Sequence, residues 1–232
     1  MNRSRFTRLL PAGWALALLA VAAGCASAPA SAPAPVDAGA VQREAEAASR
    51  LDRPYRLVFR WEVQEPGMRV QGRGVARVEP PYRARLDLFK ANGDRLAAAT
   101  LMDDRLEVPP GMAVTVPPAP MLWGALGVFR PGPDVYAASA TRPGTGHSTL
   151  RYLSIEGGEL NVSLIGGRIE RMERTTEQGV REELRVRFGD AAERFPRESI
   201  YRDLAAVREL RITMESVEHV ESYPPEVWIP GG

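Results

Sequence analysis

The sequence predicts a mainly β protein built on one long antiparallel sheet, and three observations support this fold class. Apolar and polar residues alternate through many short segments, as in Tyr55–Val63, where Leu57, Phe59 and Trp61 would share one face. Glycine and proline turns separate these segments. One apolar stretch preceded by prolines, Met121–Phe129, interrupts the alternation and predicts a buried helix. Many short strands with regular turns predict a sheet that closes toward a barrel.

The first residues predict a secretory signal peptide over residues 1–24. Met1–Arg8 carries three arginines and no acidic residue, and Ala12–Ala23 is apolar apart from one glycine. A basic segment, a short apolar segment and small residues at its end are typical of such a signal. A helix that spans a bilayer needs roughly 20 apolar residues, so a permanent membrane span is the weaker alternative.

Cys25 follows this signal and predicts a lipid anchor. The sequence Ala22-Ala23-Gly24-Cys25 resembles a bacterial lipobox, although Ala22 stands where that family usually has leucine. Cys25 is the only cysteine, so the chain has no internal disulfide. Ala26 follows it instead of aspartate, which resembles lipoproteins sorted to the outer membrane. We therefore expect an outer-membrane lipoprotein facing the periplasm; the alternative is an ordinary signal with a coincidental cysteine.

Composition and charge limit the rest of the chain to one ordinary domain with a short extension. Residues 25–50 predict the lipid anchor, an Ala/Pro-rich linker and a short helix, and residues 51–232 predict the β domain. The formal net charge is +1, and removal of the three signal arginines changes it to −2. Because the charge is balanced and dispersed, a nucleic-acid surface is not expected.

The strands are expected to follow one another along the chain, about 10–12 of them in the sheet. Gly72 and Gly74 leave no side chain on the apolar face of one strand, which suits sheet curvature or the close approach of another element. A helix is expected over Val41–Leu51. The predicted strands are Tyr55–Val63, Met68–Val78, Tyr82–Leu88, Leu96–Met102, Arg105–Val108, Met112–Val116, Val135–Ala140, Thr149–Glu156, Glu159–Ile165, Arg168–Thr175, Val180–Phe188, Glu198–Asp203 and Glu209–Val217.

No catalytic or metal-binding motif is recognisable, so we expect a protein that is not an enzyme and needs no metal or cofactor. His147 and His219, the only histidines, lack metal-ligand spacing. Glu182 and Glu183 are adjacent, so on a strand they would face opposite ways and could not form an acid–base pair. The sequence contains neither a G-x-S-x-G motif nor a P-loop.

Three segments carry a resemblance to a known fold: the strand Arg85–Phe89, the apolar helix Leu122–Gly127 and the closing stretch Pro224–Gly231. Together with the arginine-rich meander, residues 51–232 resemble the lipoprotein-localisation (LolA/LolB-like) fold, in its uncharacterised lipoprotein branch. The resemblance implies an incomplete β-barrel, or half-barrel, plugged by a helix that could act as a lid. It also implies a concave apolar cavity that binds lipid or lipoprotein acyl chains at the outer membrane.

Inward apolar side chains would form the wall of such a cavity. The alternative is that they fill a core without a cavity, and that the chain is a structural or scaffolding lipoprotein that docks a periplasmic protein partner. The candidate ligand-cavity residues are Leu57, Phe59, Trp61, Leu86, Leu88, Leu122, Trp123, Leu126 and Phe129.

Arginines predominate on the outward face of the first strands. They could meet anionic lipid headgroups, or they could form a solvated face together with nearby glutamates and aspartates. These residues are Arg56, Arg60, Arg69, Arg73, Arg77, Arg83 and Arg85.

Overall fold

The computed structural model describes residues 34–109, 116–190 and 192–229 of the chain. The signal peptide, Cys25 and most of the linker lie outside these residues, as does most of the predicted strand Met112–Val116. The predictions for those segments therefore stay predictions.

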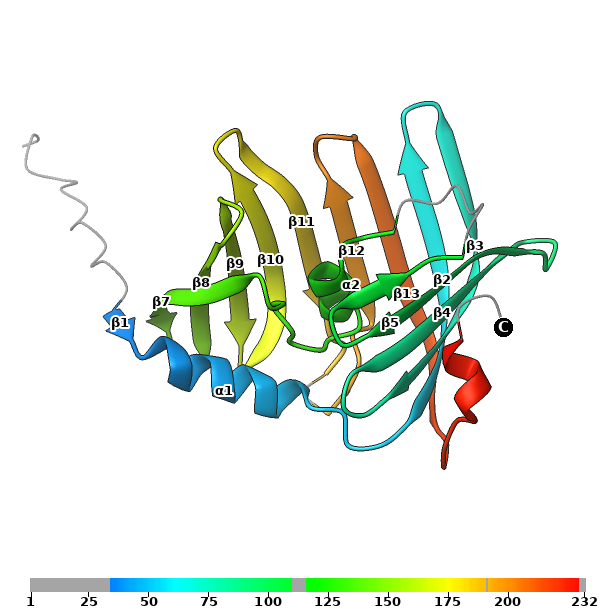
Figure 1. Ribbon diagram of the computed structural model, residues 1–232, viewed down its shortest axis with the longest axis horizontal. Helices are drawn as coiled ribbons and strands as arrows, with labels where there is room; N and C mark the ends of the chain where they lie inside the picture. The colour runs from blue at the N-terminus through cyan, green and yellow to red at the C-terminus, as the bar shows by residue number, and fades with distance from the viewer. Residues whose placement is uncertain (1–33, 110–115, 191, 230–232) are drawn as a thin grey trace, which may run out of the picture. The chain divides into compact units, whose positions relative to one another are not determined.

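The described residues form one sheet of 13 strands in which every neighbouring pair is antiparallel, in the order β1-β7-β8-β9-β10-β11-β12-β13-β2-β3-β4-β5-β6 (Figure 1). The two strands at the ends of this order, β1 and β6, do not pair with each other, so the sheet curves without closing. The predicted incomplete barrel is confirmed. The strands are β1 Ala34–Val36, β2 Tyr55–Glu65, β3 Met68–Glu79, β4 Arg83–Lys90, β5 Arg95–Met102, β6 Arg105–Glu107, β7 Val135–Gly144, β8 His147–Ser154, β9 Glu159–Ile165, β10 Arg168–Thr176, β11 Gly179–Arg187, β12 Glu198–Asp203 and β13 Arg208–His219.

Helix α1 (Ala38–Ser49) begins earlier than expected and lies across one edge of the sheet, over β7, β8 and β10 (Figure 1). The Asp37 carboxylate caps it by accepting a hydrogen bond from the Gly39 amide at 2.9 Å. Its buried residues, Val41, Ala45 and Ser49, recur every four positions and so share one face. The preceding Ala34–Val36, expected in the linker, instead pairs with β7 as strand β1. Within the described residues, no helix is long and apolar enough to cross a membrane.

Helix α2 (Ala119–Ala125) lies inside the curve of the sheet and is shorter than predicted (Figure 1). The predicted helix continued to Phe129, but Gly127 adopts a φ of +72°, which ends the helical path. The Gly127 amide donates to the Gly124 carbonyl at 2.8 Å, and the Val128 amide donates to the Trp123 carbonyl at 2.9 Å. The apolar run therefore continues past the helix as a tight turn that is still buried.

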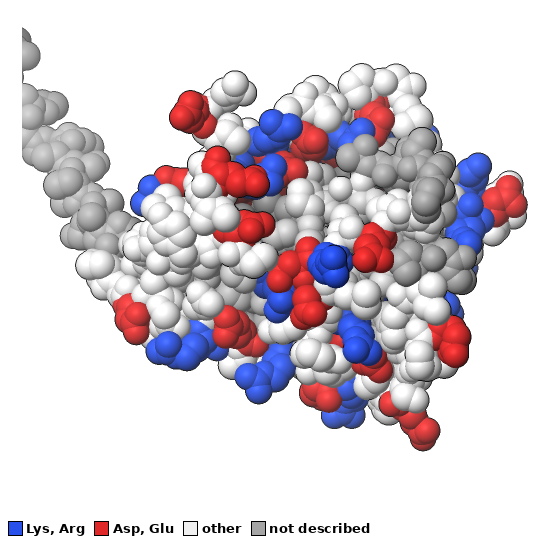
Figure 2. Space-filling model, viewed as in Figure 1, with Lys and Arg blue, Asp and Glu red and all other residues white. Residues whose placement is uncertain are grey.

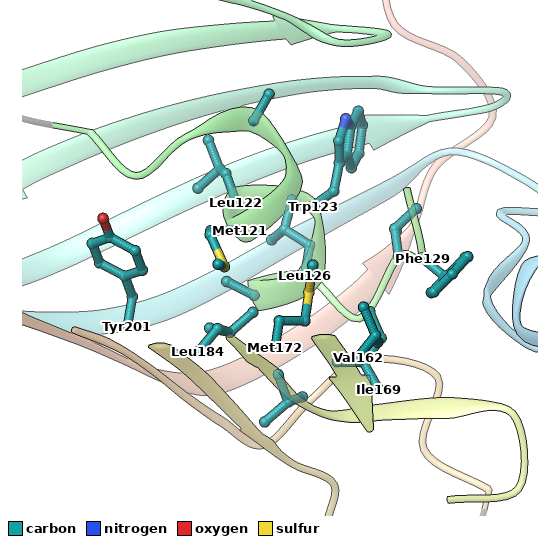
Figure 3. Close-up of a cluster of buried hydrophobic side chains, with 14 of the residues drawn as sticks. Met121, Leu122, Trp123, Leu126, Phe129, Val162, Ile169, Met172, Leu184 and Tyr201 are labelled. Atoms are coloured by element: carbon teal, nitrogen blue, oxygen red, sulfur yellow. The ribbon is translucent and has the colours of Figure 1, made fainter. Parts of the chain in front are cut away.

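Gly124 allows α2 to approach β10 and β11 closely. A Cβ atom at this position would lie 2.5 Å from Met172 Sδ and 2.7 Å from Leu184 Cδ2. Figure 3 shows Met121 and Leu126 on the side of α2 that faces Met172 and Leu184, and Leu122 on the other side of the helix. Helix α2 thus packs directly against the inner side of the half-barrel.

Gly72 and Gly74 of β3 make room for two aromatic rings of β2. A Cβ atom at Gly74 would overlap the Phe59 ring, and one at Gly72 would lie 2.9 Å from Trp61 Cζ2. Trp61 Nε1 donates to the Arg73 carbonyl at 2.9 Å, which fixes the indole over β3. The prediction that these glycines permit a close approach is confirmed.

The C-terminal segment covers part of the convex face. It forms the short 3-10 helix η1 (Pro225–Trp228), which contacts β4. Arg85 Nη1 donates to the carbonyls of Val227 at 2.9 Å and Ile229 at 3.1 Å. Arg85 is only 5% exposed, so the prediction that it belongs to a solvated or lipid-facing surface is wrong: the tail buries it.

Candidate functional site

The structure brings the nine predicted cavity residues together on the concave side of the sheet. Eight of them are at most 6% exposed, and Leu88 is partly buried. They come from β2, β4, α2 and the turn after α2, which are distant in sequence. Strand alternation directs the sheet residues inward, and α2 supplies apolar side chains on all sides.

Five of the nine line a hollow between α2 and the sheet. Its volume is about 50 Å³, and its lining is almost entirely apolar. The described residues of its wall come from β2, β4, β5, β12, β13, α2 and the segment just before α2. The five predicted residues that line it are Phe59, Trp61, Leu86, Leu88 and Leu122.

The other four, Leu57, Trp123, Leu126 and Phe129, pack in the core away from this hollow. Trp123 Nε1 donates to the Asp103 carbonyl at 2.7 Å, and its ring meets that of Tyr82 edge-on at 6.1 Å. Because the Trp123 side chain is buried and hydrogen-bonded, it anchors α2 and does not form part of the hollow's wall.

Small residues of β5 explain why the hollow exists. Ala99 pairs with Leu86, and Ala97 pairs with Leu88, so large side chains of β4 face small ones across the ladder. Both alanines line the hollow, although they were not among the predicted site residues. The available signal was the run of three alanines in Leu96–Met102, a segment that was predicted only as a strand.

A few polar groups lie where the hollow reaches the ends of β12 and β13. Arg208 lines it and forms an ion pair with Glu65. The Tyr201 hydroxyl, also in the lining, donates to Glu182 Oε1 at 2.8 Å. Burial and this hydrogen bond to Glu182 raise the pKa of Tyr201 well above its usual value, so the phenol stays protonated. These groups could orient a polar head beside an apolar chain; Tyr201 and Arg208 were not predicted.

The Glu182 carboxylate lies between the Tyr201 hydroxyl and the Arg174 guanidinium. Its second oxygen, Oε2, lies 2.7 Å from Arg174 Nε, but this ion pair lacks hydrogen-bond geometry. The side chain of Glu182 is 6% exposed, whereas that of Arg174 is 47% exposed. The carboxylate therefore links the buried phenol to a cation that water reaches.

The opposite end of the concave face is sealed. The Ser49 hydroxyl of α1 accepts a hydrogen bond from the Phe129 amide at 3.0 Å, and Arg194 donates to the Ser49 carbonyl. The Tyr152 hydroxyl donates to Gln42 Oε1 at 3.1 Å, and burial raises the Tyr152 pKa strongly. Helix α1 thus closes this end by packing and by satisfying buried polar groups.

The outward arginines pair with carboxylates. Arg60 and Arg73 share Glu215, each at 3.2 Å. An open groove of about 660 Å³ beside them has five charged residues in its lining, unlike the concave hollow, whose lining has one. The other predicted outward pairs are Arg56–Glu218, Arg69–Glu62, Arg77–Asp87 and Arg83–Glu79.

Within the part of the chain that the structure describes, no group of three His, Cys, Asp or Glu residues could hold a metal ion. The expectations that the protein is not an enzyme and binds no metal or cofactor stay predictions. Glu182 and Glu183 point to different partners, Tyr201 on one face and three arginines on the other.

Comparison with solved structures shows the fold. A LolA superfamily protein from Nitrosomonas europaea superposes with a TM-score of 0.55 at 13% identity, over 84% of this chain and 98% of that one. The chain has a LolA-like fold. A putative outer-membrane lipoprotein-sorting protein domain from Vibrio parahaemolyticus reaches a TM-score of 0.48 at 9% identity, covering 82% of this chain and 94% of that chain.

MucB in complex with MucA reaches a TM-score of 0.31 at 13% identity, over 84% of this chain and 60% of that chain. No protein-family model matches the sequence, and no curated protein matches it. The LolA-like fold therefore rests on the structure, and the ligand and partner must be argued from this chain's own residues.

Proposed function

We propose that this protein is a lipid-anchored lipoprotein of the bacterial outer membrane that binds lipid or lipoprotein acyl chains in its concave hollow, facing the periplasm. The observation that carries the proposal is the apolar hollow between α2 and the sheet, with Arg208 and Tyr201 as the polar groups of its lining. Burial of apolar surface would supply the affinity, at about 25 cal/mol per Å² removed from water, less the cost of association. The lipobox-like sequence at Cys25 supports the anchor.

The size of the hollow determines how binding must occur. Ligand pockets typically measure about 300–1,000 Å³, whereas this hollow is about 50 Å³. Leu122 of α2 occupies the space that a chain would need, so α2 acts as the lid in this proposal. Trp123 and Leu126 hold the helix in the core, and a shift of α2 about this anchor would open the hollow.

Two substitutions of opposite effect test the proposal. Leu122→Ala removes the side chain that fills the hollow and should raise the uptake of a fluorescent fatty-acid probe several-fold. Ala99→Leu fills the hollow from the other wall and should reduce uptake at least tenfold while the chain stays folded by circular dichroism. Equal uptake by both variants would contradict binding at this site.

Native mass spectrometry of the chain from Ala26 onward, produced in a bacterial periplasm, would identify the ligand class. We expect a bound lipid or fatty acid near one-to-one ratio, recoverable by organic extraction. A mass without ligand, together with no uptake of the added probe, would contradict the proposal.

The second candidate is a scaffolding lipoprotein that docks a periplasmic protein partner and binds no ligand. The observation that favours it is the same volume of about 50 Å³, since the interior is close to fully packed. Under this function both Leu122→Ala and Ala99→Leu would change stability but neither would change probe uptake.

A further inference from the structure

Exposed apolar side chains gather at one edge of the sheet. Among the described residues, nine large hydrophobic side chains are exposed, and six of these lie at or beside the turns of this edge. The turns are those joining β8 to β9, β10 to β11, β12 to β13 and β2 to β3, together with the start of β7 (Figure 1). We call this the tip edge; its six residues are Met68, Tyr136, Ile155, Val180, Leu204 and Val207.

The strand register places these turns at one edge. In an antiparallel meander alternate turns lie on the same side, and the pairs that close the turns are Glu65 with Met68, Thr176 with Gly179, and Asp203 with Arg208. At the opposite edge α1 covers the turn between β9 and β10, where a Cβ atom at Gly167 would lie 3.0 Å from Ala48 Cβ. A helix of this chain therefore covers a turn of the opposite edge, whereas the six apolar residues of the tip edge are exposed to solvent.

The tip edge carries apolar residues where turn geometry favours other types. Val207 has a φ of +53°, a left-handed conformation that strains a β-branched residue and that glycine or asparagine adopts readily. Its side chain is 69% exposed, so it gains little packing in return, and Ile155 is 70% exposed. The fold does not bury these side chains, but contact with another molecule or a membrane would.

We propose that the tip edge docks on a lipid bilayer, with the turns inserted at the level of the headgroups. Leu204 and Val207 line a surface groove together with charged residues of both signs, among them Asp203 and Arg202, and Glu177 and Arg181 flank Val180 in the sequence, so charges interrupt the apolar surface of this edge. Separate apolar tips suit the headgroup–acyl boundary. Figure 2 shows uncharged atoms at most of the outermost points of this edge, one acidic side chain projecting at the upper left, and residues of both charges beneath.

The hollow between α2 and the sheet reaches toward the tip edge. Arg208 lines both the hollow and a surface groove between the turns of β2–β3 and β12–β13. A chain that left the bilayer at the tip edge would thus meet Arg208 and then apolar wall. This step rests on the proposed function, whereas the bilayer contact does not.

The predicted tether is long enough for this orientation. Ala34 pairs with Arg142, which is seven residues (142 − 135) from Val135 at the tip edge, or about 23 Å along a strand. Nine residues (34 − 25) separate Cys25 from Ala34, and they span about 30 Å when extended. A lipidated Cys25 could therefore sit in the bilayer that the tips touch.

Vesicle binding tests the inference with the chain from Ala26 onward, which contains the whole compact unit Pro33–Gly232. Sedimentation with phosphatidylethanolamine–phosphatidylglycerol vesicles should bring the chain down without any anchor. Ile155→Asp combined with Val207→Asp should weaken this binding at least tenfold. The control, Ile165→Asp combined with Val217→Asp, adds the same two charges at exposed apolar residues away from the tip edge, which are 43% and 45% exposed. Its vesicle affinity should stay within twofold of that of the parent chain.

Single cysteines provide an independent readout, because the chain from Ala26 onward contains no cysteine of its own. An environment-sensitive fluorophore at Val207→Cys should shift to the blue on vesicle addition, and the same label at Ile165→Cys should not. No vesicle binding, an equal loss in both aspartate pairs, or no shift at position 207 would each overturn the inference. Ala99→Leu should keep vesicle binding even though it loses probe uptake, so failure of the hollow and failure of the tip edge are distinguishable.

Discussion

The concave and convex faces of the sheet bury their residues by different means. On the concave face apolar side chains pack around α2, and a buried polar group such as Glu182 has a specific partner, the Tyr201 hydroxyl at 2.8 Å. On the convex face the adjacent Glu183 meets three arginines, Arg171 and Arg185 at 2.8 Å and Arg202 at 3.6 Å. Neighbouring glutamates therefore occupy two different environments.

This difference indicates where stability and function lie. Fully buried apolar groups contribute the larger share of stability, because exposed ion pairs are worth only about 0–1 kcal/mol each. The concave face is therefore costly to alter except beside the hollow, where β5 contributes alanines. Arg85 is the exception among the seven predicted outward arginines, since the C-terminal tail buries it.

The largest loss of stability should come from Trp123→Ala on the concave face. The substitution removes a ring with no exposed surface and the hydrogen bond to the Asp103 carbonyl, so we expect a loss of about 3–5 kcal/mol in the free energy of unfolding. Urea denaturation measures it. Tyr136→Ala, at a side chain that is 55% exposed, is the control and should change stability by less than about 0.5 kcal/mol; similar losses in both would contradict the contrast.

Period-two alternation made the sheet predictable, because residues such as Leu57, Phe59 and Trp61 recur at every second position, with only Val58 of that strand out of the pattern. The end of α2 could not be predicted, since the apolar run continues to Phe129 and only the positive φ of Gly127 ends the helix. Glycines were recognised as sites of close approach in β3, but the same role of Gly124 in α2 was not foreseen.

The aromatic and leucine residues that line the candidate site could be predicted from the sequence. The hollow itself could not. Ala97 and Ala99 form part of the hollow by lacking bulk, which a sequence shows only once strand pairing is known. Arg85 was assigned to the correct face by its alternation, but its burial depends on Val227 and Ile229, more than 140 residues away in the chain. Contacts of that range follow from the fold and leave no local pattern.

A smaller effect should follow Arg85→Met on the convex face. The substitution removes the hydrogen bonds to the carbonyls of Val227 and Ile229 and the ion pair with Asp87. Asp87 retains its ion pair with Arg77, in which Nη1 lies 2.6 Å from Oδ2. We expect a loss of about 2–3 kcal/mol and faster proteolysis of the tail. Arg60→Met, at an exposed pair with Glu215, should cost less than about 1 kcal/mol; an equal cost at the two sites would show that the tail does not bury Arg85 effectively.

The smallest effect is the pH dependence carried by Glu183. Burial raises its pKa, but the hydrogen bond from Arg185 and the charges of Arg171, Arg185 and Arg202 outweigh this, so the pKa lies below its usual value. A lowered pKa means that the ionised carboxylate stabilises the fold above about pH 4.5, and that this contribution is lost as pH falls through the pKa in the folded chain.

Glu183→Gln removes that titration and leaves the size of the side chain nearly unchanged. We expect the variant to be less stable than the parent by about 0.2–1 kcal/mol near pH 7, because its arginine partners are partly exposed. The gap in urea midpoints should narrow as the pH falls below about 4.5 and through the pKa of this carboxyl in the folded parent chain. A gap that stays constant from pH 7 to pH 3 would mean that the three arginines stabilise Glu183 by shape and hydrogen bonding and not by its charge.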